Sequence, residues 1–226
     1  MGKISELWGL IYKEVDSNPT IDSNNSFYEL PYFKRDEYFA SLDNYVDFVK
    51  EVEKLVRKSP YYKRYVKYIK FDIGLNRSAI HANIEEEEEG DSKDKLLEMH
   101  HGPILTLFDY AAIITDHLLV NNMDIDTFYV ANLVIKEHFD NHVQVVMLSK
   151  TEHQAVHSYN GPFINCKQAF GDLNAFIEKY KDGLQEDQIQ KINKYIELCE
   201  QYDSFDKGIF DLKENVRKIH DEIKFY

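Results

Sequence analysis

The sequence predicts an α+β protein that is predominantly helical and contains one small sheet. Most apolar residues recur three and four positions apart, which is typical of helices with one buried face. Two short runs, residues 96–103 and 142–148, instead have the apolar and β-branched composition of strands. The second run is followed at once by a helix-capping pattern, so a strand–strand–helix unit is expected within a helical protein. With 226 residues, 43% of them hydrophobic, the chain can bury a sizeable core.

The first third of the chain should be mainly helical. An early helix is expected near residues 4–15, and residues 17–26 have the composition of a loop. A stronger helix follows Ser41, which can cap it, and Ser59-Pro60 should interrupt that helix. Residues 65–74 and 80–84 are interpreted as strands. The apolar positions of the helix after Ser41 have helical spacing and are Tyr45, Phe48, Val49, Val52, Leu55 and Val56.

The middle third carries the strand–strand–helix unit. The run LLEMHHGP is interpreted as a strand that ends at His100 and His101, before a Gly-Pro stop. Helices are expected over residues 104–120 and 127–139, the second capped by Asp126. The run HVQVVML follows as a strand, and Ser149 and Glu152 have capping-box spacing for a helix that Gly161-Pro162 ends.

The last third should again be helical, over residues 173–180 and 188–202. A short apolar stripe then steps by three and four positions, which favours intramolecular packing but also allows a protein partner. The predicted organisation is an N-terminal helical region (1–72), a core (73–162) with a helical insert at 103–140, and a C-terminal helical region (163–226). The stripe comprises Ile209, Leu212, Val216, Ile219 and Ile223.

Charge is distributed unevenly. The formal net charge of −13 counts against a protein that is coated in nucleic acid. Residues 57–70 nevertheless contain six basic residues, four tyrosines and no acid, whereas residues 85–91 are almost entirely acidic. The basic stretch predicts either a surface for nucleic acid, with tyrosines for stacking, or a solvated helix face with its tyrosines in the core. The candidate nucleic-acid-binding residues are Arg57, Lys58, Lys63, Arg64 and Lys67.

The two cysteines, Cys166 and Cys199, lack the spacing of a zinc ribbon or of a disulfide framework. They are interpreted as small buried hydrophobic residues in a protein of the reducing cytoplasm. No apolar run approaches the length of a membrane span, and the first residues do not resemble a signal peptide.

Four histidines suggest a metal site. His153 and His157 lie four positions apart on the predicted helix, so both can point at one atom. His100, at the end of the first strand, can complete a site for one divalent ion, with Zn, Ni, Mn or Mg as candidates. His101 is expected to face the same place and to take a proton from water. A structural zinc is the alternative to a catalytic ion.

The runs EMHHGPILTLFDY and HFDNHVQVVMLSKTEHQAVHS resemble the HNH (His-Me finger, ββα-metal) endonuclease family, particularly HNH-type proteins of large tailed phages. The resemblance covers roughly residues 96–160. It implies a ββα-metal core with His100, His153 and His157 as metal ligands, His101 as the general base and Asn141 as the residue that orients this base. The long helical insert departs from the family, and so does Gln144, which occupies the position where spacing would place the asparagine.

The resemblance implies a metal-dependent endonuclease of the host cytoplasm that hydrolyses DNA phosphodiester bonds. The alternative is a catalytically inactive protein that binds a protein partner or mimics nucleic acid. An enzyme should lose cleavage in a His101→Ala variant and keep its metal binding and melting temperature. A binding module should be indifferent to that change.

Overall fold

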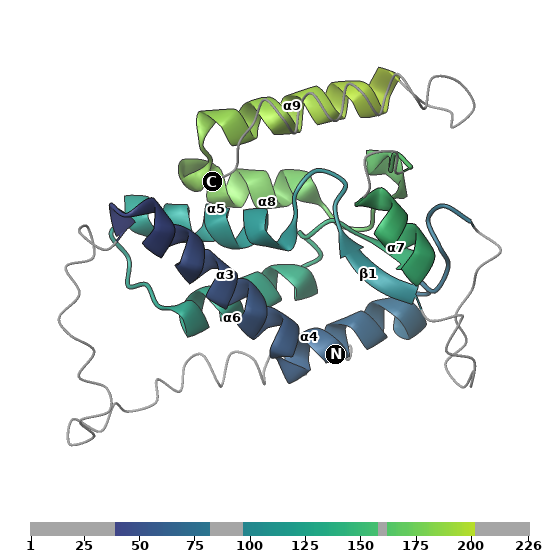
Figure 1. Cartoon of the computed structure of the whole chain (residues 1–226), viewed down its shortest axis with the longest axis horizontal. Helices are drawn as coiled ribbons and strands as arrows, with labels where there is room; N and C mark the ends of the chain where they lie inside the picture. Colours follow the sequence, from purple (N-terminus) through teal and green to yellow (C-terminus); the bar gives the residue numbers. More distant parts are fainter. Residues whose placement is uncertain (1–38, 82–96, 158–161, 202–226) are drawn as a thin grey trace.

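The computed structural model of the chain describes residues 39–81, 97–157 and 162–201, and this part is mostly helical with one small sheet (Figure 1). The predominantly helical character predicted from the sequence is confirmed. In chain order the elements are α3 (Leu42–Lys58), α4 (Pro60–Lys67), a π-helix (Tyr68–Asp72), β1 (Leu97–His101), α5 (Leu107–Val120), α6 (Thr127–Phe139), β2 (Val145–Ser149), α7 (Lys150–Val156), α8 (Leu173–Tyr180) and α9 (Glu186–Gln201), with 3-10 turns at Cys166–Gln168 and Lys181–Gly183.

The helix predicted after Ser41 is α3, and the Ser41 side chain accepts a hydrogen bond from the backbone N–H of Asn44. Ser59 and Pro60 interrupt the helical path as expected, because Pro60 opens α4 where its missing N–H has no cost. The strand predicted over residues 65–74 is wrong, since this segment continues α4 into the π-helix. Its tyrosines favour strands locally, but Tyr62, Tyr65 and Ile69 are buried at helical spacing.

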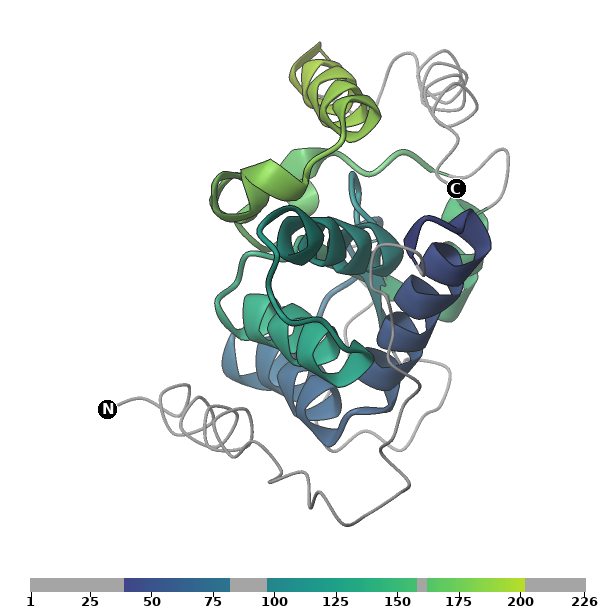
Figure 2. The same cartoon turned by 90° about the vertical axis from the view of Figure 1, so that its left-hand side faces the viewer.

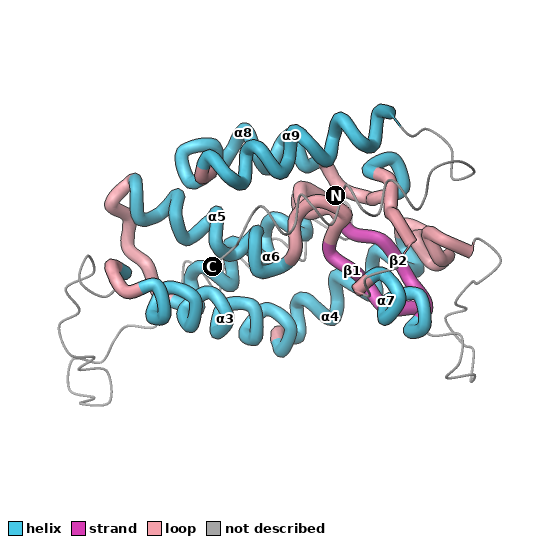
Figure 3. Tube along the Cα trace, turned by 45° about the horizontal axis from the view of Figure 1, so that its top comes forward, coloured by secondary structure: helices cyan, strands magenta, loops and turns pink. Residues whose placement is uncertain are grey.

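β1 and β2 form an antiparallel pair in which His100 lies opposite Val146. Both strands were predicted from the sequence, and α5 and α6 lie between them in the chain. Of the predicted strand at 80–84, Ile80 and His81 are described and are not in a strand. Figure 3 shows the two strands and α7 together at one end of the molecule.

The two faces of the sheet have different surroundings, because side chains alternate along a strand. One face, with Leu97, Met99, Val145 and Met147, joins the large core shared with α3, α4, α5 and α6. On the other face, Val146 and Leu148 pack with Val156 of α7 and with Ile164. The sheet is therefore covered by the helical body on one side and by α7 on the other.

The capping predictions hold for the helices around the sheet. Asp126 caps α6 through the N–H of Tyr129. Ser149 and Glu152 form a reciprocal capping box, so α7 begins directly at the end of β2. α7 is shorter than expected, because it ends at Val156, with His157 as its C-cap, rather than at Gly161-Pro162.

α8 and α9 cover the far side of α5, and α9 is the outermost helix in both Figure 1 and Figure 2. A buried ion pair joins α9 to α5, because Lys191 Nζ lies 3.3 Å from a carboxylate oxygen of Asp109. The Tyr195 hydroxyl also donates to the Ile164 carbonyl at 3.1 Å. The early helix at 4–15, the loop at 17–26, the acidic run at 85–91 and the apolar stripe at 209–223 lie outside the described residues.

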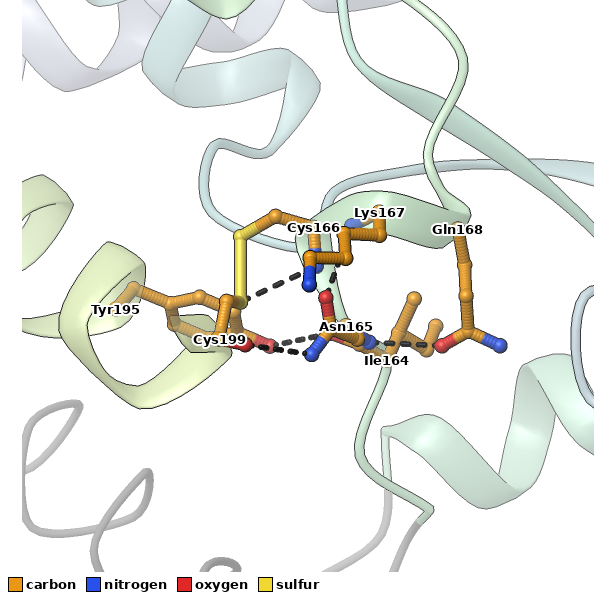
Figure 4. The surroundings of a disulfide bond; sticks show 7 residues. All are labelled: Ile164, Asn165, Cys166, Lys167, Gln168, Tyr195 and Cys199. Atoms are coloured by element: carbon orange, nitrogen blue, oxygen red, sulfur yellow. Dashed lines mark hydrogen bonds between the residues drawn. A yellow bond between two sulfur atoms is a disulfide. The ribbon is translucent and has the colours of Figure 1, made fainter. Parts of the chain in front are cut away.

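Cys166 and Cys199 form a disulfide that joins the 3-10 turn after Asn165 to the last turns of α9 (Figure 4). The expectation of two separate thiols is wrong, because their Cα atoms are 5.9 Å apart although the residues are 33 positions apart in the chain. Asn165 supports the same contact by donating from its side-chain amide to the Cys199 carbonyl at 2.9 Å. Sequence spacing could not reveal a pairing that depends on how α9 returns to the core.

Among the described residues, no helix is both long enough and apolar enough to span a membrane. The division into regions 1–72, 73–162 and 163–226 stays a prediction.

Candidate metal centre

Three histidines converge between the sheet and α7. His100 comes from β1, and His153 and His157 come from α7 and its C-cap. The ring centroid of His100 lies 5.1 Å from that of His153 and 5.1 Å from that of His157. The ring centroids of His153 and His157 are 5.0 Å apart. One nitrogen of each ring lies within 4.8 Å of the other two nitrogens, so the three can hold a single ion. The structure thus brings together the three histidines that the sequence predicted as ligands.

Glu98 is a further member of this centre. It lies two residues before His100 on β1, so both side chains face α7. Its carboxylate accepts a hydrogen bond from Nδ1 of His153 at 2.5 Å. With the proton held at Nδ1, the Nε2 lone pair of His153 is available to a metal. The i, i+2 spacing of Glu98 and His100 on a strand was the signal from which this role could have been found.

The surroundings favour the neutral form of His100. Burial, together with the nearby charges of His153, His157 and Arg57, lowers its pKa to about 4. The pKa of His157 is also lowered, first by burial and then by His153. Only neutral imidazole donates a lone pair to a metal, so protons do not compete with an ion for His100 near pH 7.

His101 points away from the three-histidine group. It lies on the opposite face of β1 and is only 6% exposed, among the core helices. Its Nε2 lies 2.9 Å from Nε2 of His138 in α6. His138 Nδ1 donates to the Val134 carbonyl at 2.7 Å, so a neutral His138 accepts at Nε2 and His101 donates there. Tyr62 stacks on the outer face of the His101 ring.

The expectation that His101 faces the same site as His100 is therefore wrong. Consecutive residues of a strand face opposite sides, so His100 and His101 cannot both turn toward α7. Burial lowers the pKa of His101 well below its ordinary value, and the charge of His138 adds to this effect. His101 is a buried, hydrogen-bonded residue in this structure.

Asn141 is also apart from the three histidines. It follows α6 with a positive φ of 60°, a conformation that asparagine tolerates better than most residues. Its carbonyl accepts from the N–H of Asp172, which joins this turn to the start of α8. Its side-chain Oδ1 is buried and has no hydrogen-bond partner. The described contacts of Asn141 are thus those of a turn residue.

A second group of possible ligands lies beside Asn141, at Glu137, Asp140 and His142. Its carboxylates already have cationic partners. Glu137 accepts from Lys179, from the Tyr180 hydroxyl at 2.8 Å and from His142 at 2.7 Å. Asp140 accepts from Lys136 at 2.6 Å. An ion here would displace two ammonium groups, so this group is better explained as an ion-pair network.

The basic stretch combines features of both interpretations made from the sequence. Tyr62 and Tyr65 are buried in the core, so these rings do not stack on bases. The side chains of all five candidate residues are exposed. Exposure is expected both for a solvated helix face and for a surface that binds nucleic acid. Arg57 is paired with Glu53 at 2.7 Å.

Together, the fold and the site define a mostly helical protein with a small antiparallel sheet and a three-histidine cluster. The chain belongs to the family of bacteriophage G278-like virion proteins, whose model matches residues 1–224. No curated protein and no solved structure shows significant similarity to the chain.

The expected membership of the HNH family is wrong, because the matching family model describes a virion protein and covers almost the entire chain. The family points to a structural role in a phage particle and not to the nuclease or hydrolase class that the resemblance implied. The phage origin fits the family. The protein is a virion component with protein partners in the virion, rather than specifically a cytoplasmic protein.

Proposed function

We propose that this virion protein binds one transition-metal ion through His100, His153 and His157. The observation that supports this proposal is the convergence of three imidazole nitrogens within 4.8 Å of one another, from two elements that meet only in the folded chain. In this role the ion cross-links β1 to α7, and so fastens the small sheet to the helix that covers it. Zn²⁺ is the preferred ion, because imidazole suits it and Mg²⁺ prefers oxygen ligands.

Metal binding can be measured by titrating the purified, EDTA-treated chain with Zn²⁺ in a calorimeter. We expect one ion per chain, and a melting temperature that rises with Zn²⁺ because the ion binds only the folded state. His153→Ala should weaken binding by at least about 100-fold, since it leaves two ligands. Glu98→Gln should weaken it by roughly 10-fold, because the partner that orients His153 loses its charge.

His142→Ala is the matched control, because His142 also bonds a carboxylate but belongs to the second group. It should leave the affinity unchanged. A stoichiometry near zero, or an affinity that responds to His142→Ala and not to His153→Ala, would contradict the proposed centre.

A second candidate function is hydrolysis of DNA phosphodiester bonds at the same centre. Two observations favour it. Three protein ligands leave one position for water or a phosphate oxygen, as in catalytic zinc sites. Arg57, with its fixed positive charge, is close enough to lower the pKa of His100. In this candidate the nucleophile is a metal-bound water, since His101 is buried on the other side of β1. The alternative is a centre that only stabilises the fold.

Nicking of supercoiled plasmid separates these two roles. The chain is incubated with Zn²⁺, Mn²⁺, Ni²⁺ or Mg²⁺, or with EDTA, beside His153→Ala and His142→Ala. Hydrolysis predicts nicking that needs a metal, disappears in His153→Ala and survives in His142→Ala. A chain that binds zinc in the calorimeter but does not nick with any of these ions has a structural centre, and the second candidate is then rejected.

A further inference from the structure

α4 has two chemically distinct faces. Tyr62 and Tyr65 are buried against the core, next to His138 of α6. Lys63, Arg64 and Lys67 are exposed on the opposite face, where positions three and four apart are neighbours. Arg57 and Lys58, at the end of α3, are also exposed and adjoin the start of α4. We call these five residues the α4 basic face.

The α4 basic face is a local exception in an acidic protein. No acidic residue occurs from Leu55 to Phe71, although the whole chain has a formal net charge of −13. Arg57 is paired with Glu53 of α3 at 2.7 Å. Cations in the last turn of a helix also interact favourably with its carbonyl end. That effect explains why a cation is favourable at each of the positions of Arg57, Lys58, Arg64 and Lys67. It does not explain why five exposed cations occur together with no acidic residue among them.

α4 lies beside β1, on the side of the strand opposite the metal centre. The π-helix that continues α4 reaches β1, where Lys70 donates to the Leu97 carbonyl. At the other end of the strand, Tyr62 of α4 stacks on His101. α4 therefore runs alongside β1 on its core side, and α7 with its two histidines covers the other side (Figure 1).

We propose that the α4 basic face binds the phosphate backbone of nucleic acid. Lysine and arginine side chains on one helix face match the regular negative charge of a phosphodiester chain. The burial of Tyr62 and Tyr65 removes the rings that base stacking would need, so contacts go to phosphates and binding does not depend on sequence. A protein partner with an acidic surface is the competing occupant, and it becomes an outcome of the test.

The test uses the full chain and a short fluorescein-labelled DNA duplex, with anisotropy measured between about 50 and 200 mM salt. We expect binding whose log–log salt slope is roughly −3.5 to −4.5, because four to five cations each displace about 0.9 counterions from duplex DNA. The variant Lys63→Glu/Arg64→Glu/Lys67→Glu should bind at least about 10-fold more weakly and with a slope nearer zero. Duplexes of unrelated sequence should bind equally.

The matched control is Lys167→Glu/Lys181→Glu/Lys194→Glu, which changes the net charge equally but on the side of the molecule formed by α8 and α9. It should bind as the wild type does. Circular dichroism of both variants checks that α4 and α9 stay folded. Equal loss of binding in both triple variants would mean that only net charge matters, and absence of binding by the wild type at low salt would leave an acidic protein as the occupant. Either result overturns the proposal.

Binding of DNA to the α4 basic face does not require the metal ion. Only a contact between the bound DNA and the metal centre would rest on the proposed function. All titrations are therefore repeated in EDTA and with His153→Ala. Unchanged affinity in both supports the α4 basic face even if the metal centre fails. Affinity that disappears with the ion would instead assign the DNA contact to the metal and contradict the role of α4.

Discussion

The two adjacent histidines of β1 have different chemistry because they occupy different sides of one strand. His100 faces α7 and two further imidazoles, whereas His101 faces the core and bonds His138. Both have lowered pKa values, mainly through burial. Burial therefore has a different consequence at each residue. A neutral His100 can bind a metal ion, whereas a neutral His101 donates a hydrogen bond within the core.

The buried pair of His101 and His138 predicts a loss of stability in acid. Burial lowers the pKa of His138 to about 4 and that of His101 well below its ordinary value, whereas both titrate near 6.5 in the unfolded chain. Between these values the unfolded chain binds more protons, so the free energy of unfolding rises with pH. The contribution is complete above about pH 6.5 and is lost toward pH 4, by up to about 1.4 kcal/mol per pH unit for each histidine.

Urea unfolding in EDTA at several pH values between 4.5 and 7.5 measures this dependence. His138→Gln is the informative variant, because its amide oxygen can still accept from His101 while one titrating group is removed. Its stability should fall less steeply with acid than that of the wild type. An identical slope in the two proteins would mean that His138 is not the buried neutral group described here.

The structure brings together the three histidines predicted as metal ligands, whereas the predicted base, His101, lies apart from them. The i, i+4 spacing of His153 and His157 limits their geometry so strongly that only a third ligand had to be found. His138 belongs to another helix, so no local pattern could link it to His101. A His101→Ala variant is consequently expected to melt at a lower temperature, and not at an unchanged one.

At the scale of elements, α9 is held to the rest of the molecule by a few specific contacts. These are the buried Lys191–Asp109 pair, the hydrogen bond from Tyr195 to Ile164, and the disulfide. Ile164 in turn packs on β2 and near Val156 of α7. The contacts of α9 therefore continue to α7, which carries His153 and is capped by His157, two of the proposed metal ligands.

Removing the disulfide should weaken this attachment. A cross-link between residues 33 positions apart contributes about 4 kcal/mol in the chain-entropy model. Cys199→Ser should lower the free energy of unfolding by roughly that amount under oxidising conditions, as measured by urea denaturation. Dithiothreitol should lower the wild type to the same level and leave the variant unchanged. A reductant that shifts neither protein would show that the two thiols are not bonded in solution.

Three helix starts were predictable from a capping side chain, whereas α5 was predicted to begin at residue 104 although Thr106 caps it. Ser41, Asp126 and Ser149 each begin the helix that they were expected to begin. The segment at 65–74 was not predictable in this way. Its tyrosines and isoleucine have strand propensity, and only the packing of Tyr65 and Ile69 in the core decides for a helix.

At the scale of the whole molecule, local chemistry and family membership turned out to be separate questions. The run from Glu98 to His157 brings together a strand pair, a capped helix and three histidines, and these features led to a nuclease family. Membership is decided over the full length of the chain, and there the match is to a phage virion protein. A set of ligands on a small sheet is a property of a site and can occur in unrelated folds.

The order of β1, α5, α6, β2 and α7 also has a consequence for how the chain folds. Glu98 of β1 and His153 of α7 are 55 positions apart, and α5 and α6 lie between the two strands in the chain. Closing so long a loop is entropically unfavourable, so the sheet forms after the local helices. The ligand set is complete only once that step has taken place. If the proposed ion binds, an ion added during refolding should be captured after the two strands have paired, and its rate of capture would then report on the closure of the sheet.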